Sequence, residues 1–269
     1  MNKFYIQIVF FLLSITLYVN NKTLATELAP EENTKTKSKK CYPTSEEVYE
    51  ENKYLLCTDP NETTEANKLM NDAVKHLEYH AASEDDYEFV WEDPFRDIFC
   101  FKKKHKDDIN FEKLKYIIRD SDKYNEEIDN LWDPDSTNLL DFDSVKRKIV
   151  RVYSPNLVMI QQRYKNCPLG RKKYFYALVK KTQISENITI IAMTSANIND
   201  HSPSKKKYKN KIIENANLFT TEIDSEDDIR IGKIKKTYVN IAGYLIEKKD
   251  SHVDVTYVES VSDIQILTT

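Results

Sequence analysis

Two histidines, His76 and His80, lie four residues apart in a stretch with helical periodicity. This spacing places both imidazoles on one helix face and suits a pair of metal ligands. The HExxH frame of zinc hydrolases does not surround them, so a solvated helix face is the favoured interpretation. Ser195 lacks the Gly-x-Ser-x-Gly turn that exposes a nucleophilic serine. The other histidines are scattered along the chain, at His105, His201 and His252.

Asp133 and Asp135 flank Pro134, and their carboxylates suit either an acid/base pair or a turn cap. The chain has only 3 glycines, and they are too far apart in the sequence to form a phosphate-binding loop. P-loop and Rossmann nucleotide binding are therefore excluded. We expect a protein that is not an enzyme and that needs no cofactor and no metal.

Charge is spread along the chain. The 269 residues include 40 Lys and Arg against 44 Asp and Glu, a net charge of −4. Nucleic-acid binding is not expected, because it depends on clustered basic residues. The lysine runs 102–104 and 205–207 are interpreted as solvated loops, with contact to an anionic membrane surface as the alternative. The cysteines form two bridges in any of three pairings or remain buried thiols; they are Cys41, Cys57, Cys100 and Cys167.

The chain begins with a segment typical of a secretory signal. Lys3 precedes an apolar run from Phe4 to Val19, and small residues follow at Thr23 and Ala25. We predict cleavage after Ala25 and secretion, with an uncleaved signal anchor as the alternative. The predicted organisation is a signal peptide at 1–25, a disordered polar leader at 26–60, a folded domain at 61–262 and a tail at 263–269.

Periodicity predicts the elements of this domain. Apolar residues recur at helical spacing over 63–79, and a second, short helix ends at Pro134. We expect an α+β fold with an antiparallel sheet that has one apolar and one polar face, held by a few helices. Strand patterns cover 89–91, 97–101, 113–118, 145–153, 157–164, 173–181, 188–195, 234–245 and 252–260.

The strands carry more apolar and aromatic residues than a thin sheet with two short helices needs. A curved sheet that closes over a cavity explains this excess, and a plain core between sheet and helices explains it equally well. The residues in question are Leu157, Met159, Tyr174, Tyr176, Ile190, Ala192, Tyr238 and Tyr244.

Long blocks of the sequence carry a family resemblance. They are MNKFYIQIVFFLLSI at the start, YPTSEE at 42–47, LWDPD at 131–135, VKRKIVRVYSPNLVMIQQRYK at 145–165, RKKYFYAL at 171–178, MTSANIND at 193–200, IIENANLFTT at 212–221 and NIAGYLIEKK at 240–249. In this order they resemble the fam-a proteins, the secreted and exported proteins of malaria parasites that have a START-like lipid-binding domain.

The resemblance implies a START-like helix-grip fold, in which a bent antiparallel sheet and flanking helices enclose a cavity. START domains close this cavity with a long C-terminal helix. Only residues 263–269 follow the last predicted strand, so we expect that helix to be missing.

The resemblance also implies a lipid site. The family's Trp-Asp pair falls on Trp132 and Asp133, whose carboxylate would balance a quaternary ammonium, and Gln161 falls where choline-lipid proteins place a cage tryptophan. The candidate lipid-binding residues are Trp132, Asp133, Met159, Gln161, Tyr174, Tyr176, Ala192, Tyr238 and Tyr244.

The implied function is binding and transfer of one phospholipid, with phosphatidylcholine as the expected lipid and transient contact with membranes. The implied destination is the parasitophorous vacuole or the host erythrocyte. The alternative is a protein–protein interaction module at the host–parasite interface, on a START scaffold that has lost its ligand.

Overall fold

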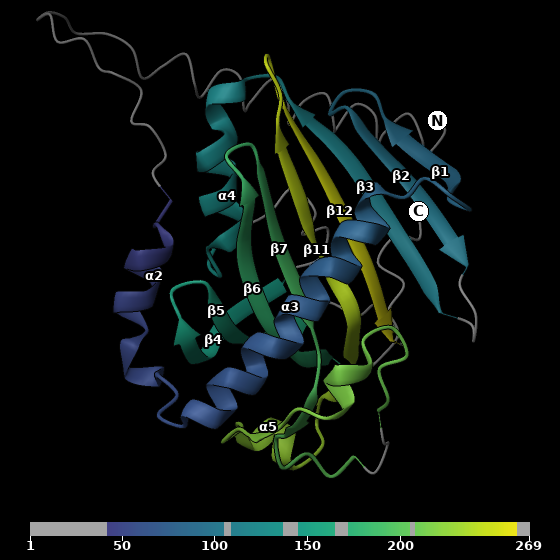
Figure 1. Cartoon of the computed structure of the whole chain (residues 1–269). Coiled ribbons are helices and arrows are strands. Elements are labelled where there is room, and N and C mark those ends of the chain that lie inside the picture. Colours follow the sequence, from purple (N-terminus) through teal and green to yellow (C-terminus); the bar gives the residue numbers. More distant parts are fainter. Residues whose placement is uncertain (1–41, 105–108, 137–144, 165–171, 205–207, 263–269) are drawn as a thin grey trace, which may run out of the picture. The chain divides into compact units, whose positions relative to one another are not determined.

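The computed structural model describes residues 42–104, 109–136, 145–164, 172–204 and 208–262. Its main feature is a 10-stranded sheet, and Figure 1 shows nine of its strands, in the order β1-β2-β3-β12-β11-β7-β6-β5-β4. The short strand β10 pairs with β6. Strands that are neighbours in this order are antiparallel, and β10 runs parallel to β6. The strands are β1 (Glu88–Asp93), β2 (Ile98–Lys104), β3 (Asn110–Ile118), β4 (Val145–Ser154), β5 (Leu157–Tyr164), β6 (Lys173–Ser185), β7 (Ile188–Thr194), β10 (Lys235–Lys236), β11 (Tyr238–Lys248) and β12 (Val253–Ser262).

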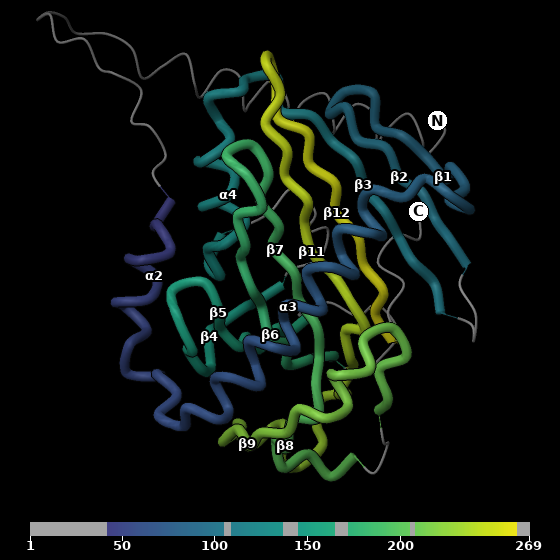
Figure 2. Tube along the Cα trace, viewed as in Figure 1, coloured from purple at the N-terminus to yellow at the C-terminus, as the bar shows by residue number. Residues whose placement is uncertain are grey.

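A small parallel sheet, β8 (Asn197–Asn199) and β9 (Thr220–Glu222), stands apart from the main one and is labelled in Figure 2. The α-helices are α2 (Ser45–Glu51), α3 (Pro60–Ala82), α4 (Tyr124–Trp132) and α5 (Asp227–Arg230). The predicted antiparallel α+β fold is therefore confirmed. The predicted signal peptide (1–25) and C-terminal tail (263–269) lie outside the described residues, so the prediction of a missing closing helix stays a prediction.

The long helix α3 forms where the periodicity predicts it. Asp59 caps its start, because the side chain accepts a hydrogen bond of 2.8 Å from the backbone N–H of Asn61. Pro60 occupies the first turn, where its missing N–H costs nothing. The apolar stripe of the helix, from Ala66 to Ala81, is buried against β6, β7, β11 and β12, which α3 crosses (Figure 1).

The sheet has two apolar faces, where the sequence predicts one apolar and one polar face. Ile190 and Leu245 point to the side covered by α3, which we call the α3 face. Their neighbours Ile191 and Tyr244 point to the other side, where α4 packs, and we call this the α4 face. Successive strand residues alternate between faces. Strands β5, β7 and β11 bury most positions on both faces, and β6 does so from Tyr174 to Val179.

Gly243 lets α3 approach the sheet closely. It lies on β11 with φ +146, opposite Ala192 of β7. A Cβ at this position would collide with the carbonyl oxygen of Ile191 and would lie 2.7 Å from Cδ2 of Leu77 on α3. Any larger residue must therefore push the helix and the two strands apart.

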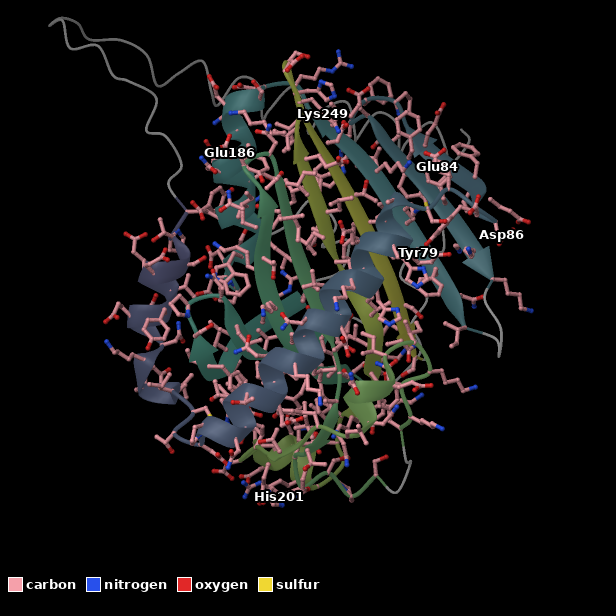
Figure 3. The ribbon with its side chains drawn as sticks, in the orientation of Figure 1. Tyr79, Glu84, Asp86, Glu186, His201 and Lys249 are labelled. Carbon is pink, nitrogen blue, oxygen red and sulfur yellow. The ribbon has the colours of Figure 1, made fainter. Side chains whose placement is uncertain are left out.

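A buried lysine joins the other end of α3 to the sheet. The ammonium of Lys113 on β3 donates hydrogen bonds to the carbonyls of Ala81 and Ser83, at the C-terminal end of the helix. It also lies 3.7 Å from the ring centroid of Tyr87, and burial lowers its pKa to about 8. Figure 3 labels Glu84 and Asp86 on the loop after α3, where they pair with lysines of β3 and β2 at 3.0 and 3.5 Å.

The folded domain begins earlier than predicted, so the predicted leader (26–60) is wrong for its last part. Thr44 and Glu47 form a reciprocal capping box that starts α2. Val48 is buried in the core of the α4 face, and the N–H of Cys57 donates to the carbonyl of Val152 on β4 at 2.8 Å. The apolar content of this stretch is too low to signal burial in the sequence.

Two further sequence predictions are settled in part. His80 is buried and stacks on Phe111 with ring centroids 4.2 Å apart, so the predicted solvated histidine face is wrong for this residue. Cys57 and Cys100 are free thiols. Cys41 and Cys167 lie outside the described residues, and their pairing stays open.

We expect Gly243→Ala to lower the free energy of unfolding by about 1–3 kcal/mol, because the added methyl group overpacks the join of α3 and β11. Gly232→Ala is the matched control. This glycine also has positive φ (+69), but an added Cβ would meet only the ring of Pro203. We therefore expect the free energy of unfolding to fall by only about 1 kcal/mol. Denaturant unfolding of both variants measures the difference, and equal costs would contradict the role of Gly243.

Candidate functional site

An apolar pocket lies on the α4 face of the sheet, beside the C-terminal end of α4. The empty space between its walls measures about 1100 Å³, including the open mouth. Only about 90 Å³ of this space is wide enough for the centre of a water molecule. The walls therefore lie close together. The lining residues are Leu114, Leu131, Trp132, Asp133, Pro134, Val145, Arg147, Ile149, Val158, Ile160, Gln162, Tyr164, Phe175, Val179, Ile191, Met193, Val239, Ala242, Tyr244, Tyr257, Glu259 and Val261.

The end of α4 is fixed by a chain of hydrogen bonds. Asp133 ends the helix, and one of its carboxylate oxygens accepts from the N–H of Asp135 at 2.9 Å, as in a turn cap. The hydroxyl of Ser136 donates to the amide of Asn130, which in turn donates to Glu127 at 3.1 Å. Since Glu127 also accepts from the hydroxyl of Tyr116 on β3 at 2.8 Å, the helix end is tied to the sheet.

Trp132, the last residue of α4, combines burial with an unused donor. The side chain is 6 % exposed, and its indole N–H has no hydrogen-bond partner in the described part of the chain. The ammonium of Lys181 lies 5.6 Å from its ring centroid. A buried donor without a partner is uncommon in folded proteins, and a ligand is one way to satisfy it.

Among the described lining residues, three side chains are charged. Asp133 follows α4 and is half-buried. Arg147 on β4 donates through Nε to the amide oxygen of Gln162 on β5 at 2.8 Å. Glu259 on β12 is 5 % exposed and is the most deeply buried of the three.

The surroundings of Glu259 disfavour its negative charge. Burial raises its pKa to about 8, and the charge of Glu112 on the neighbouring strand acts in the same direction. The hydroxyl of Tyr257 opposes this by donating to Oε2 of Glu259 at 2.7 Å. Lys102, on the next strand, lies 3.4 Å from Glu112.

Of the candidate residues named from the sequence, Trp132, Asp133 and Tyr244 lie together around this pocket. The carboxylate of Asp133 is already engaged in the turn after α4, as described above. Tyr244 packs against Tyr257 with ring centroids 4.8 Å apart.

The other candidates lie elsewhere, so the full predicted set does not form one site. Met159, Tyr174, Tyr176 and Ala192 belong to the core of the α3 face, on the opposite side of the sheet. Gln161 points the same way and donates to the hydroxyl of Tyr176 at 2.6 Å. Because side chains alternate along a strand, a shift of one residue separates the two faces, and the pattern alone does not say which face encloses a pocket.

Two of the displaced tyrosines have structural partners instead. The hydroxyl of Tyr174 donates to the buried carboxylate of Asp200 at 2.9 Å, and Asp200 also pairs with Lys236 at 2.9 Å. Tyr238 stacks on Tyr208 with ring centroids 4.2 Å apart. These contacts fix the loops that follow β7 and precede β11.

The pocket also contains residues that the sequence analysis did not single out, notably Arg147, Gln162, Tyr257 and Glu259. The sequence signal for Glu259 was weak, because β12 contains a second acidic residue, Asp254. An acid is typical of an exposed strand position, and the burial of Glu259 depends on the neighbouring strands.

Among the residues that the structure describes, histidine, cysteine, aspartate and glutamate form no group that could hold a metal ion. Within the same ranges, none of the helices has the length and apolar character needed to cross a bilayer.

The architecture is similar to that of proteins with solved structures. No family model and no curated protein matches the chain. Among solved structures, human StAR-related lipid transfer protein 5 matches with a TM-score of 0.50 and 10% identity, over 77% of this chain and 84% of that one. The fold is START-like. Human STARD10 also matches, with a TM-score of 0.47 and 13% identity, over 72% of this chain and 68% of that one.

The raised pKa of Glu259 can be tested through the dependence of stability on pH. The unfolded chain releases this proton near its ordinary pKa of 4.5, whereas the folded state holds it up to about 8. Between these values stability therefore falls as pH rises, by about 1.4 kcal/mol per pH unit from this group. Glu259→Gln has no proton to lose, so we expect a flatter dependence of stability on pH and a more stable protein at pH 8.

Thermal unfolding across pH 5–8 measures this effect. The matched control is Glu88→Gln on β1, where the side chain is exposed, and the slope should stay that of the natural protein. The same slope in the Glu259→Gln variant would contradict the buried, protonated state of Glu259.

Proposed function

We propose that this protein binds one phospholipid in the pocket on the α4 face and carries it between membranes. The observation that carries the proposal is the apolar pocket between α4 and the sheet of a START-like fold. The solved structure with a TM-score of 0.50 to this chain is named as a human StAR-related lipid transfer protein. Burial of acyl chains against aliphatic and aromatic walls supplies the affinity.

The narrow walls imply that the lipid opens the pocket as it enters. The part wide enough for a water molecule's centre, about 90 Å³, is far smaller than a phospholipid, and drug-sized ligands already occupy about 300–1,000 Å³. Separation of the α4 end from the sheet is the simplest way to widen it, because Leu131, Trp132 and Pro134 form one wall.

The headgroup and the destination are narrower proposals. Phosphatidylcholine is the lipid that the sequence resemblance implies, and Trp132, Asp133 and Tyr244 around the pocket supply an acid and aromatic rings for a choline group. Secretion and export to the vacuole or the host erythrocyte, and kinship with the fam-a proteins, are supported by the signal-like start and by the sequence blocks alone.

Binding rather than catalysis is the proposed role. The described pocket lining has no histidine, cysteine, serine or lysine, which are the side chains most often used as nucleophiles or general bases. Its charged members are the partly engaged Asp133 and Arg147 and the buried Glu259.

Native mass spectrometry with lipid extraction tests the proposal on the full chain expressed through a secretory route. We expect one phospholipid per chain and transfer of phospholipid between vesicles. Met193→Trp should abolish both, because Met193 lies in the pocket lining and the larger ring fills the narrow space.

Ile184→Trp is the matched control, since Ile184 is an exposed apolar strand residue outside the pocket. Its lipid content and transfer should equal those of the natural protein. A lipid-free protein that moves no lipid, or equal lipid content in both variants, would contradict the proposal.

A second candidate function, as a protein-binding module, has one observation in its favour. The edge strand β1 and the turn after it expose Phe89 (57 %) and Phe95 (97 %). Exposed aromatic residues on a sheet edge are typical of protein-binding surfaces. A partner that is lost with Phe89→Ser and Phe95→Ser, but retained by Met193→Trp, would favour this function over lipid transfer.

A further inference from the structure

Glu259 carries a carboxylate oxygen to which none of the described residues donates a hydrogen bond. The side chain lines the apolar pocket and is nine-tenths buried or more. Its Oε2 accepts from Tyr257, whereas its Oε1 accepts no hydrogen bond from any residue that the structure describes. A carboxylate oxygen that accepts from none of the described residues is free to accept a hydrogen bond from a ligand in the pocket.

The cations near Glu259 do not neutralise it. In the sheet register Glu259 lies opposite Glu112, and Glu112 lies opposite Lys102. The ammonium of Lys102 is 3.4 Å from Glu112, so the nearest strand cation pairs with the other acid. On the far side of Glu259 stands Ala242 of β11, which has no polar side chain.

The other charged residues of the pocket are already engaged. Arg147 donates to Gln162 through Nε, and Asp133 accepts from the turn after α4. The remaining titratable groups of the lining are Tyr164, Tyr244 and Tyr257. Glu259 is therefore the lining group best placed to receive a donor from a ligand.

We propose that Glu259 selects the polar end of the bound lipid and favours a headgroup whose cationic nitrogen carries an N–H over one that is fully methylated. This inference rests on the proposed binding of a phospholipid, and it replaces the choline headgroup that the sequence resemblance implies with an amine that carries an N–H. In the empty pocket burial raises the pKa of Glu259, so the carboxyl is mostly protonated at neutral pH. A primary ammonium supplies the donor and the opposite charge that stabilise the carboxylate, so the carboxyl releases its proton when such a headgroup binds. A trimethylammonium has the same charge but no donor.

A series of lipids with the same acyl chains separates the donor from the size of the headgroup. The probes are dioleoyl phosphatidylethanolamine, its N,N-dimethyl derivative and dioleoyl phosphatidylcholine. The dimethyl lipid has nearly the bulk of choline but keeps one N–H. We expect the full chain to bind the first two similarly and the third about tenfold more weakly, the size of effect expected for one charge-assisted hydrogen bond.

Glu259→Gln tests the residue without threatening the fold, since we expect it to be at least as stable at neutral pH. Its amide oxygen takes the hydrogen bond from Tyr257, and its amide nitrogen donates, so the preference for an N–H should disappear. Glu112→Gln is the matched control, because this acid occupies the same row of the sheet but is not in the lining. It should keep the preference.

The outcomes distinguish failure of the headgroup preference from failure of lipid binding. The inference is supported if the affinity falls only at the last methylation and if this difference disappears in Glu259→Gln but not in Glu112→Gln. Equal binding of all three lipids, a stepwise fall with each methyl group, or a preference retained by Glu259→Gln would overturn it and leave lipid binding intact. Failure to bind any of the three would overturn the proposed function as well.

Discussion

The structure depends on the close contact between α3 and the centre of the sheet. Gly243 allows this contact, because a side chain there would strike Leu77 of the helix and the backbone of β7. Once the helix covers one face, the period-two alternation of the strands assigns every side chain to the α3 face or the α4 face. Lys113 fixes the other end of the helix through the carbonyls of Ala81 and Ser83.

The pocket lies on the face of the sheet that α3 does not cover. The α3 face is filled along the length of the helix, whereas the α4 face is covered by a shorter helix, α4, of 9 residues against 23 in α3. Beyond the end of α4 the apolar wall continues from Ile191 and Tyr244 to Val239 and Val261. Both faces of this START-like sheet therefore carry an apolar core, and the α4 face also has the pocket that we propose as the lipid site.

Much of this fold could be predicted from the sequence. The helical stripe from Ala66 to Leu77 and the short helix ending before Pro134 have strong periodicity, and the strand patterns follow β4 to β7 closely. Residues 45–60 were harder, because their burial depends on a capping box and on a few contacts such as Val48 rather than on composition.

The site was less predictable than the fold, for a geometric reason. Neighbours such as Gln161 and Gln162 differ in sequence position by one residue but lie on opposite faces, so alternation alone left the choice of face open. Trp132, Asp133 and Tyr244 lie around the pocket, while Met159, Tyr174, Tyr176 and Ala192 lie under α3. Glu259 escaped notice because an acid on a strand is ordinarily exposed.

The central claim is that lipid occupies the α4 face. A phospholipid with a photoreactive group in its acyl chain, cross-linked to the full chain and mapped by peptide mass spectrometry, tests it most directly. The account predicts attachment to pocket residues such as Met193, Tyr244 and Val261. Attachment to Met159, Tyr176 or other residues under α3, or labelling spread evenly over the surface, would contradict it.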